Sequence, residues 1–161
     1  MGAGKTTIGN RLAKKLAIDF IDSDKKIEKD LGKTINDIFT QNSEEYFRKI
    51  EKETIKNIIS EDQPLILSIG GGAFNDKDTR KLIKEETVSI WLNADLDVIL
   101  ERVSRNNKRP LLNNVDKKET LTKILEERKI FYQECDIIIN SGVDNHIKTI
   151  DNIINEIQKI L

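Results

Sequence analysis

The stretch MGAGKTTIGNRLAKKL, residues 1–16, decides the fold of this chain. Its opening carries the second half of a P-loop, the phosphate-binding pattern G-x-x-x-x-G-K-[ST], and the first glycine of that pattern would stand one position before Met1. Because glycine has no Cβ, successive backbone N–H groups of such a loop turn inward and cradle phosphate oxygens. The predicted nucleotide-binding residues of the loop are Gly2, Ala3, Gly4, Lys5, Thr6 and Thr7.

The side chains at the end of the loop suit the same chemistry. Lys5 supplies a point charge that reaches the terminal phosphates, and the Thr6 hydroxyl is a hard oxygen ligand for Mg²⁺. A helix is predicted over residues 7–16 because apolar side chains recur four residues apart, and its positive end would face the phosphates. A glycine-rich start to an ordinary helix is the alternative that this fragment alone leaves open.

The composition limits the class of protein. The 161 residues suit one α/β domain, and 27 basic against 28 acidic residues give a net charge of −1, so no nucleic-acid partner is expected. No stretch approaches the roughly 18 apolar residues that cross a membrane, so no membrane partner is expected either. Cys135 is the only cysteine, which excludes an internal disulfide and favours a cytoplasmic location.

Short strand-like runs alternate with helical segments along the rest of the chain. This alternation predicts an α/β fold with a parallel sheet flanked by helices, and the apolar run Leu65–Ile69 suits a strand buried on both faces. Residues 105–116 are polar and rich in asparagine, which is typical of a lid loop. The predicted strands are 17–21, 64–69, 87–93 and 136–140, and the predicted helices are 24–31, 34–40, 44–60, 76–84, 95–105, 117–133 and 145–160.

Two acids, Asp22 and Asp24, follow the first predicted strand. Ligands bind at the carboxyl ends of the strands in open α/β sheets, so this position is a candidate site. One carboxylate would help to hold Mg²⁺ and its waters, and the other would orient or deprotonate an alcohol. Capping of the next helix is an equal alternative, because Ser and Asp are favoured N-cap residues.

Three glycines, Gly70, Gly71 and Gly72, follow the second predicted strand. They let the backbone approach a ligand closely and expose N–H donors, although a tight turn uses the same residues. Arg48 and Arg128 each lie in a predicted helix among acidic residues, where a solvated, salt-bridged face is the default interpretation. If the two arginines converge, their guanidinium groups would bind a carboxylate through planar, bidentate contacts.

Arg109 lies in the predicted lid, in the run Arg109–Leu112. An arginine on a closing loop supplies positive charge to a phosphoryl group in transit, where such contacts change rates by orders of magnitude. A cation on a solvated loop is the alternative interpretation.

Taken together, these motifs resemble those of the shikimate kinase family, in order and spacing, over nearly the whole chain. The resemblance implies a monomeric, three-layer P-loop kinase fold whose five-stranded parallel sheet has the order 2-3-1-4-5. It also implies an ATP-dependent kinase of aromatic amino acid biosynthesis, which uses Mg²⁺ and transfers the γ-phosphoryl group of ATP to the 3-hydroxyl of shikimate. The motifs are GAGKTT at 2–7, DSD at 22–24, FRKIE at 47–51, GGG at 70–72, RPLL at 109–112 and ERKIFY at 127–132.

The resemblance further implies a role for each candidate residue on the nucleotide side. Lys5 and the loop amides would hold the β- and γ-phosphates, Thr6 would bind Mg²⁺, and Asp22 would act on the metal through water. Arg109 would close over the phosphates with the lid, and Arg102 would lie beside the adenine.

On the acceptor side, the resemblance implies that Asp24 orients the substrate hydroxyls and accepts the proton. Arg48 and Arg128 would bind the shikimate carboxylate, and the glycine backbone would add contacts. The implied substrate-binding set is Asp24, Arg48, Gly70, Gly71, Gly72 and Arg128, and the implied catalytic set is Asp24, Lys5 and Arg109.

The family's first strand, which lies at the centre of its sheet, has no counterpart here before Met1. We expect the polypeptide to begin about ten residues earlier, the length of a strand and its turn, so that residues 1–161 form one domain without that strand. The third and fourth family strands would then lose their shared neighbour and expose unpaired backbone groups. Two other functions remain open: a related small-molecule kinase such as gluconate kinase, and a non-catalytic module that binds shikimate or nucleotide.

Overall fold

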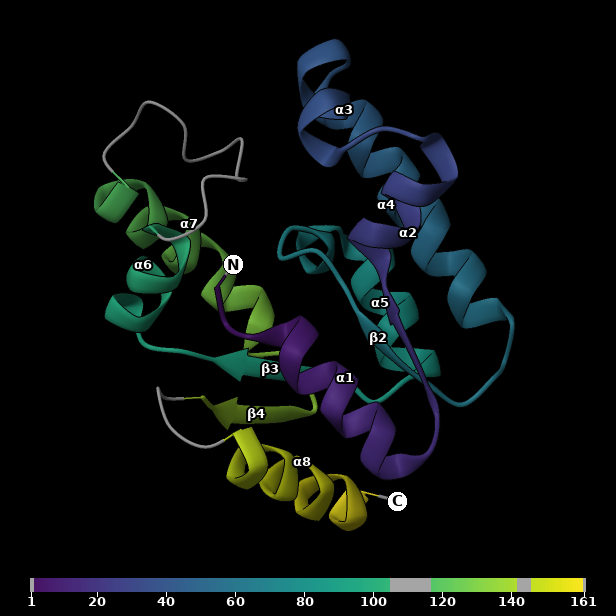
Figure 1. Cartoon of the computed structure of the whole chain (residues 1–161), viewed down its shortest axis with the longest axis vertical. Helices are drawn as coiled ribbons and strands as arrows, with labels where there is room; N and C mark the ends of the chain where they lie inside the picture. The colour runs from purple at the N-terminus through teal and green to yellow at the C-terminus, as the bar shows by residue number, and fades with distance from the viewer. Residues whose placement is uncertain (1, 105–116, 142–145, 161) are drawn as a thin grey trace.

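The computed structural model describes residues 2–104, 117–141 and 146–160. It shows an α/β fold in which helices flank short parallel strands, as the sequence predicts (Figure 1). The predicted lid, with Arg109, lies outside these ranges. The elements are α1 (Lys5–Leu16), β1 (Asp19–Asp22), α2 (Ser23–Leu31), α3 (Ile35–Gln41), α4 (Glu44–Ser60), β2 (Leu65–Ser68), the 3₁₀ turn η1 (Ala73–Asn75), α5 (Lys77–Glu86), β3 (Ile90–Asn93), α6 (Leu96–Ser104), α7 (Lys117–Tyr132), β4 (Ile137–Asn140) and α8 (His146–Ile160).

The first helix begins earlier than the sequence predicts, at Lys5 instead of Thr7. Gly4 has the left-handed φ of 83°, and its carbonyl oxygen accepts a hydrogen bond of 2.9 Å from the Ile8 amide. This bond closes the first helical turn directly after the glycine, so Lys5 and Thr6 lie in the helix. The two side chains predicted to meet phosphate and metal are therefore held by helical backbone, which is more rigid than a loop.

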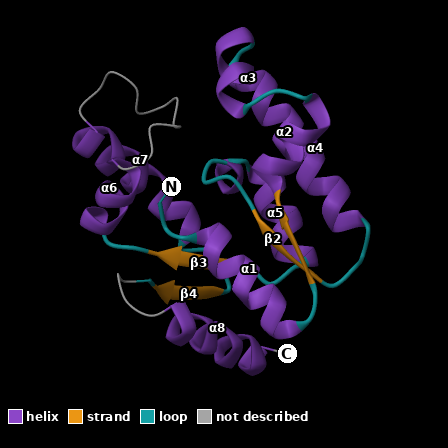
Figure 2. Ribbon diagram, in the orientation of Figure 1, coloured by secondary structure: helices purple, strands orange, loops and turns teal. Residues whose placement is uncertain are grey.

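The four strands form two separate parallel pairs, β1 with β2 and β3 with β4. Asp19 pairs with Leu65 in the first ladder, and Ile90 pairs with Ile137 in the second. Within the described ranges, no strand lies between β2 and β3, and Figure 2 shows the two pairs as distinct parts of the ribbon. In the expected family order 2-3-1-4-5, the pair β1–β2 would correspond to strands 2 and 3, and the pair β3–β4 to strands 4 and 5.

One prediction about the strands is wrong. The apolar β2 suits a strand buried on both faces, but Leu65, Ile66 and Leu67 are only half-buried and Ser68 alone is buried. The reason is the pairing: β2 has a hydrogen-bonded neighbour on one edge, β1, and no described strand covers the other.

Helix α1 joins the two strand pairs through the main hydrophobic core. Ile8 and Leu12 of α1 pack with Ile137 and Ile139 of β4 and with the inner face of α8, while Ile66 of β2 packs against the same cluster. Burial of each aliphatic side chain of this size stabilises the fold by roughly 1.5–3 kcal/mol relative to exposure. The helix that carries the P-loop residues is thus anchored in the core.

A second cluster positions α4, the helix of Arg48. Ile27 of α2, Ile38 of α3 and Phe47 of α4 pack together, and the first two are fully buried. The start of α4 is capped by the Ser43 hydroxyl, which accepts a hydrogen bond of 3.2 Å from the Tyr46 amide. Among the helices of the described ranges, none is both long enough and apolar enough to cross a membrane.

Candidate active site

The P-loop backbone turns through two left-handed glycines before α1 begins. Gly2 has a φ of 68° and Gly4 a φ of 83°, conformations that cost a residue with a Cβ roughly 1–2 kcal/mol. The Arg102 guanidinium of α6 donates a hydrogen bond of 2.9 Å from Nη1 to the Gly2 carbonyl oxygen. The family resemblance implies that Arg102 lies beside adenine, and the structure places its guanidinium against the backbone of the P-loop.

The two predicted metal ligands lie in direct contact. The Thr6 hydroxyl of α1 donates a hydrogen bond of 2.9 Å to Oδ2 of Asp22, at the end of β1. Asp22 is also the N-cap of α2, since its Oδ1 accepts from the Lys25 amide at 3.4 Å, so the capping interpretation of this acid holds as well. A hydroxyl and a carboxylate side by side are the hard oxygen donors that suit Mg²⁺, so the chain's own residues fit the predicted cation.

Asp24 lies on the other side of the same short segment, in the first turn of α2. A Cβ built on Gly70 would stand 3.1 Å from Asp24 Oδ1 and even closer to Oε1 of Glu51. Both carboxylates therefore pack against the bare backbone of the first glycine after β2. The sequence singled out Asp24 and Gly70 but assigned no role to Glu51.

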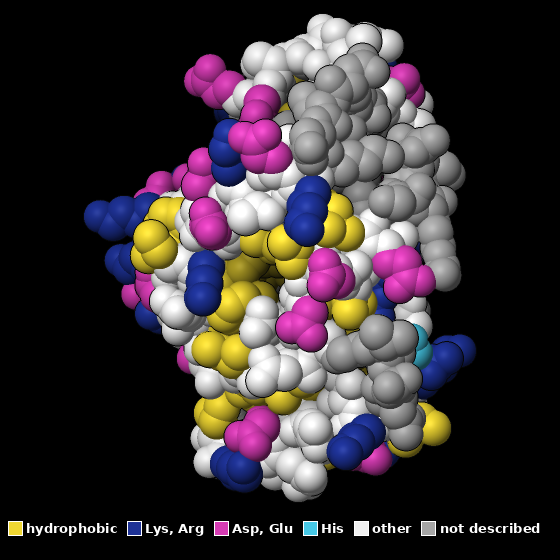
Figure 3. Space-filling model, turned by 90° about the vertical axis from the view of Figure 1, so that its left-hand side faces the viewer, with side chains coloured by type: hydrophobic (Ala, Val, Ile, Leu, Met, Phe, Trp, Pro, Cys, Tyr) yellow, Lys and Arg dark blue, Asp and Glu magenta, His cyan; other side chains and the backbone are white. Residues whose placement is uncertain are grey.

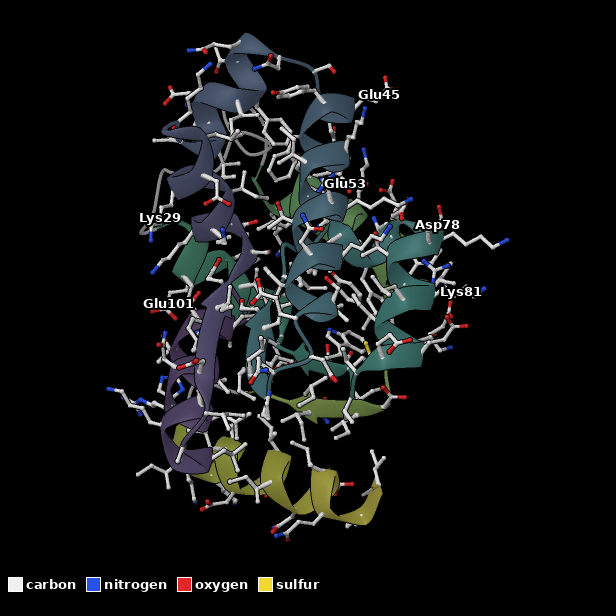
Figure 4. All side chains as sticks on the ribbon, turned by 90° about the vertical axis from the view of Figure 1, so that its right-hand side faces the viewer. Lys29, Glu45, Glu53, Asp78, Lys81 and Glu101 are labelled. Carbon is white, nitrogen blue, oxygen red and sulfur yellow. The ribbon has the colours of Figure 1, made fainter. Side chains whose placement is uncertain are left out.

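Glu51 is a buried acid that pairs with Arg48 one turn earlier on α4. Its side chain is 2 % exposed, and its Oε2 accepts a hydrogen bond of 2.6 Å from Arg48 Nη1. By contrast, Glu45 of the same helix lies at the outer edge of the molecule (Figure 4). The signal for Glu51 was the three-residue spacing from Arg48, which places both side chains on one helical face.

The charge state of this pair depends on its surroundings. Burial raises the pKa of Glu51 and the Asp24 carboxylate adds to that rise, while the cations Arg48 and Arg128 oppose it. Burial lowers the pKa of Arg48, but Glu51 and Glu44 outweigh burial, so the net shift is upward and the guanidinium stays charged. Oε1 of Glu51 accepts no hydrogen bond from any described residue, so a donor on a ligand or a water would complete it.

Arg48 and Arg128 line one pocket of about 450 Å³, together with Glu51 and Gly72. Arg128 is 8 % exposed on α7. A Cβ on Gly72 would come within 2.5 Å of Arg48 Nη2, so the guanidinium lies flat against that glycine. The default interpretation of a solvated, salt-bridged face is therefore wrong for the buried Arg128. Arg48 does keep an exposed partner in Glu44, but its guanidinium also pairs with the buried Glu51.

The glycine loop is also held from α7. The Tyr132 hydroxyl donates a hydrogen bond to the Gly71 carbonyl oxygen, across 61 positions in sequence. Tyr132 belongs to a motif quoted from the sequence, but only the structure shows what its hydroxyl contacts.

One face of the molecule is hollowed at mid-height, with hydrophobic atoms inside the hollow and charged side chains around it (Figure 3).

The site combines a glycine-rich loop that opens a helix, a hydroxyl–carboxylate pair and a pocket lined by two arginines. These are the features expected of a small P-loop kinase. The family model for shikimate kinase matches residues 1–160, nearly the whole chain. This chain belongs to the shikimate kinase family, and it is an ATP-dependent kinase of that family.

Individual relatives agree with this assignment. A shikimate kinase from Bartonella henselae is 39 % identical over 161 residues, which are 100 % of this chain and 76 % of that protein. The solved shikimate kinase from Acinetobacter baumannii, in complex with shikimate, superposes with a TM-score of 0.95 at 32 % identity, covering 99 % of this chain and 89 % of that one.

A more distant structure tests the related-kinase alternative. A gluconokinase from Sinorhizobium meliloti has a TM-score of 0.62 at 13 % identity, and it covers 99 % of this chain and 88 % of its own. A likeness at that identity shows a shared fold alone. The comparisons thus place this chain with the shikimate kinases, and gluconate phosphorylation gains no support from them beyond the common architecture.

Proposed function

We propose that this chain transfers the γ-phosphoryl group of ATP to the 3-hydroxyl of shikimate, giving shikimate 3-phosphate and ADP. The observation that carries the proposal is the placement of two chemically distinct groups on either side of Asp22–Asp24. On one side Asp22 contacts Thr6 of the P-loop helix at 2.9 Å, and on the other Asp24 packs against Gly70. This short segment would therefore connect the P-loop with the glycine segment, whose Gly72 lines the pocket of Arg48 and Arg128.

The nucleotide half would use the P-loop. The amides of residues 2–7 would hold the β- and γ-phosphates, and Lys5 would reach the terminal phosphates with its charge. Thr6 and Asp22 would hold Mg²⁺, which supplies charge neutralisation on the phosphates when bound. Arg102, already bonded to the Gly2 carbonyl, would fix the loop near the nucleotide, and Arg109 would add positive charge from the lid.

The acceptor half would use the pocket between α4 and α7. Shikimate carries one carboxylate and several hydroxyls, and Arg48 and Arg128 offer charged donors to the carboxylate. Backbone N–H groups of the glycine loop would add donors, and Asp24 would orient a hydroxyl and accept its proton during transfer. Phosphoryl transfer depends mainly on positioning and positive charge, which are what these residues supply.

The proposal also covers the oligomeric state, the location and the partners of the chain. We take the chain as a single domain that acts as a monomer in the cytoplasm, with ATP and shikimate as its small-molecule partners and neither nucleic acid nor membrane. The single cysteine supports the cytoplasmic location, and the net charge of −1 supports the lack of a nucleic-acid partner.

The test is shikimate-dependent ADP release by the purified chain with Mg-ATP, with the product identified by ³¹P NMR. We expect turnover with shikimate, little with gluconate, and a loss of at least about a hundredfold in Asp24→Asn, since a positioned base contributes roughly 10²–10⁴-fold. Binding of shikimate without ADP release would instead identify the non-catalytic module. Turnover of gluconate in preference to shikimate would overturn the acceptor assignment.

A further inference from the structure

The glycine segment, residues 70–75, is fixed to the end of α7 by a single hydroxyl at its start. The Tyr132 hydroxyl donates to the Gly71 carbonyl oxygen. The Tyr132 ring centroid lies 5.5 Å from Trp91 of β3 and 6.3 Å from Phe74 of η1. The ring packs against both aromatic side chains, which restricts where its hydroxyl can point.

The other end of the glycine segment is fixed to the same helix end through Arg80. Its Nη1 donates to the carbonyl oxygens of Phe74 and Asn75, at 2.9 and 3.1 Å. The guanidinium also pairs with Glu134 at 3.2 Å and lies 4.6 Å from the centroid of the Phe131 ring. Arg80 therefore holds the far end of the segment, and the Tyr132 hydroxyl holds its beginning from α7.

The hydroxyl of Tyr132 links the two sides of the pocket that Arg48 and Arg128 line. Arg128 lies four residues before Tyr132 on α7, so the two side chains share a helical face. On the segment, Gly71 is followed by Gly72, whose backbone lies against the Arg48 guanidinium. A path of direct contacts thus runs from α7 through Tyr132, Gly71 and Gly72 to Arg48.

We propose that Tyr132 is a positioning residue for the acceptor: it sets the spacing between the Gly71–Gly72 backbone and Arg128 without touching the substrate. The inference rests on the proposed function, in which these groups bind shikimate. Burial raises the pKa of Tyr132, with Arg128 opposing, so at neutral pH the hydroxyl keeps its proton and remains a donor. Loss of this donor would leave the Gly71 carbonyl unpaired and let the start of the segment move away from Arg128.

The test is Tyr132→Phe, which removes the hydroxyl and keeps the ring contacts with Trp91 and Phe74. The matched control is Tyr46→Phe on the only other tyrosine, which is 44 % exposed near the start of α4. We expect KM for shikimate to rise roughly threefold to tenfold in Tyr132→Phe, the worth of one hydrogen bond, with KM for ATP changed less than about twofold. Hydrogen exchange should accelerate in a peptide covering residues 69–76, and the control should match the parent in all three measurements.

The outcomes separate the positioning role from a merely structural one. A parallel rise of both KM values, with a lower Tm, would show general destabilisation and overturn the inference. Unchanged KM for shikimate and unchanged exchange would overturn it too. If the parent chain itself does not phosphorylate shikimate, the proposed function fails, and exchange in residues 69–76 still decides whether Tyr132 holds the segment: acceleration supports that contact and no change rejects it.

Discussion

Arg48 and Glu51 form an ion pair of 2.6 Å in which the carboxylate is almost completely buried and the guanidinium reaches into the candidate pocket. A second acid, Glu44, pairs with the same guanidinium at 3.0 Å, and its side chain is 54 % exposed. One arginine thus has a buried partner and a solvated one on the same helix. Because burial decides how much a charge pair contributes, the two acids offer a matched comparison.

The first prediction compares Glu51→Gln with Glu44→Gln. Glu51→Gln removes the charge that orients Arg48, so we expect kcat/KM for shikimate to fall roughly tenfold to a hundredfold, because losing one partner of a buried pair is costly. Glu44→Gln removes an exposed partner and should change it less than about threefold. Steady-state kinetics with varied shikimate at saturating Mg-ATP makes the comparison. Equal effects of the two substitutions would contradict the role of burial.

The second prediction concerns the contact between Thr6 and Asp22. Thr6→Val keeps the side-chain shape and removes the hydroxyl, so the chain loses one of its two predicted metal ligands. We expect the Mg²⁺ concentration for half-maximal ADP release to rise at least about tenfold, by analogy with the cost of a lost charge-assisted contact. Thr40→Val, at an exposed position on α3, is the control and should leave the magnesium titration unchanged. Identical titrations for both variants would place the metal elsewhere.

The third prediction concerns the close approach of Gly72 to Arg48. An added methyl group would stand 2.5 Å from Arg48 Nη2, so Gly72→Ala must displace the guanidinium. We expect weaker shikimate binding by at least about tenfold in calorimetry, with ATP binding nearly unchanged, since a displaced donor loses its charge-assisted contact.

Gly32→Ala is the control for Gly72→Ala. Gly32 caps α2 with a φ of 62° and has no neighbouring atom within 4 Å of an added Cβ. A methyl group there strains the backbone by about 1 kcal/mol and should lower Tm by a few degrees while shikimate affinity is kept. If Gly32→Ala weakened shikimate binding as much as Gly72→Ala, the effect would come from stability and not from Arg48.

The fourth prediction concerns Cys135, just before β4. Burial raises the pKa of its thiol to about 11, with Asp136 adding to the rise and the Ser89 hydroxyl opposing it. At pH 8 we therefore expect a thiol reagent to label the native chain at least about tenfold more slowly than the urea-unfolded chain, because the thiolate is the reactive species. Cys135→Ser should show no labelling, and comparable rates in native and unfolded chains would contradict the burial of the thiol.

The same shift has a consequence for stability. The native pKa of Cys135, about 11, lies above the 9.0 of an unperturbed thiol, so the folded state holds this proton more tightly than the unfolded state. The resulting stabilisation is complete below about pH 9 and is lost as the pH rises through about 11. The Tm of the parent chain should therefore fall relative to the Tm of Cys135→Ser as the pH rises from 9 to 11.

The local elements were predictable because their signals are local. Ile8 and Leu12 recur at helical spacing and form the buried face of α1, and the apolar run at 137–139 became β4. The P-loop pattern and the acids after the first strand were singled out separately from the sequence, and the structure brings Thr6 and Asp22 into contact. The half-burial of β2 could not be predicted from its composition, because burial of a strand depends on which neighbours flank it.

Sequence by itself determined the alternation of strands and helices, the glycines of the P-loop and the residue types that suit phosphate, magnesium and a carboxylate. These depend on spacing and backbone sterics within a few residues. Only the tertiary structure decided that Glu51 is buried against Arg48 and Gly70, and that the Tyr132 hydroxyl reaches Gly71. Arg48 and Glu51 are neighbours on one helix, but Gly70 and Gly71 lie far from Glu51 and Tyr132 in sequence, so the burial of Glu51 and the Tyr132 hydrogen bond exist only once helices and strands have packed.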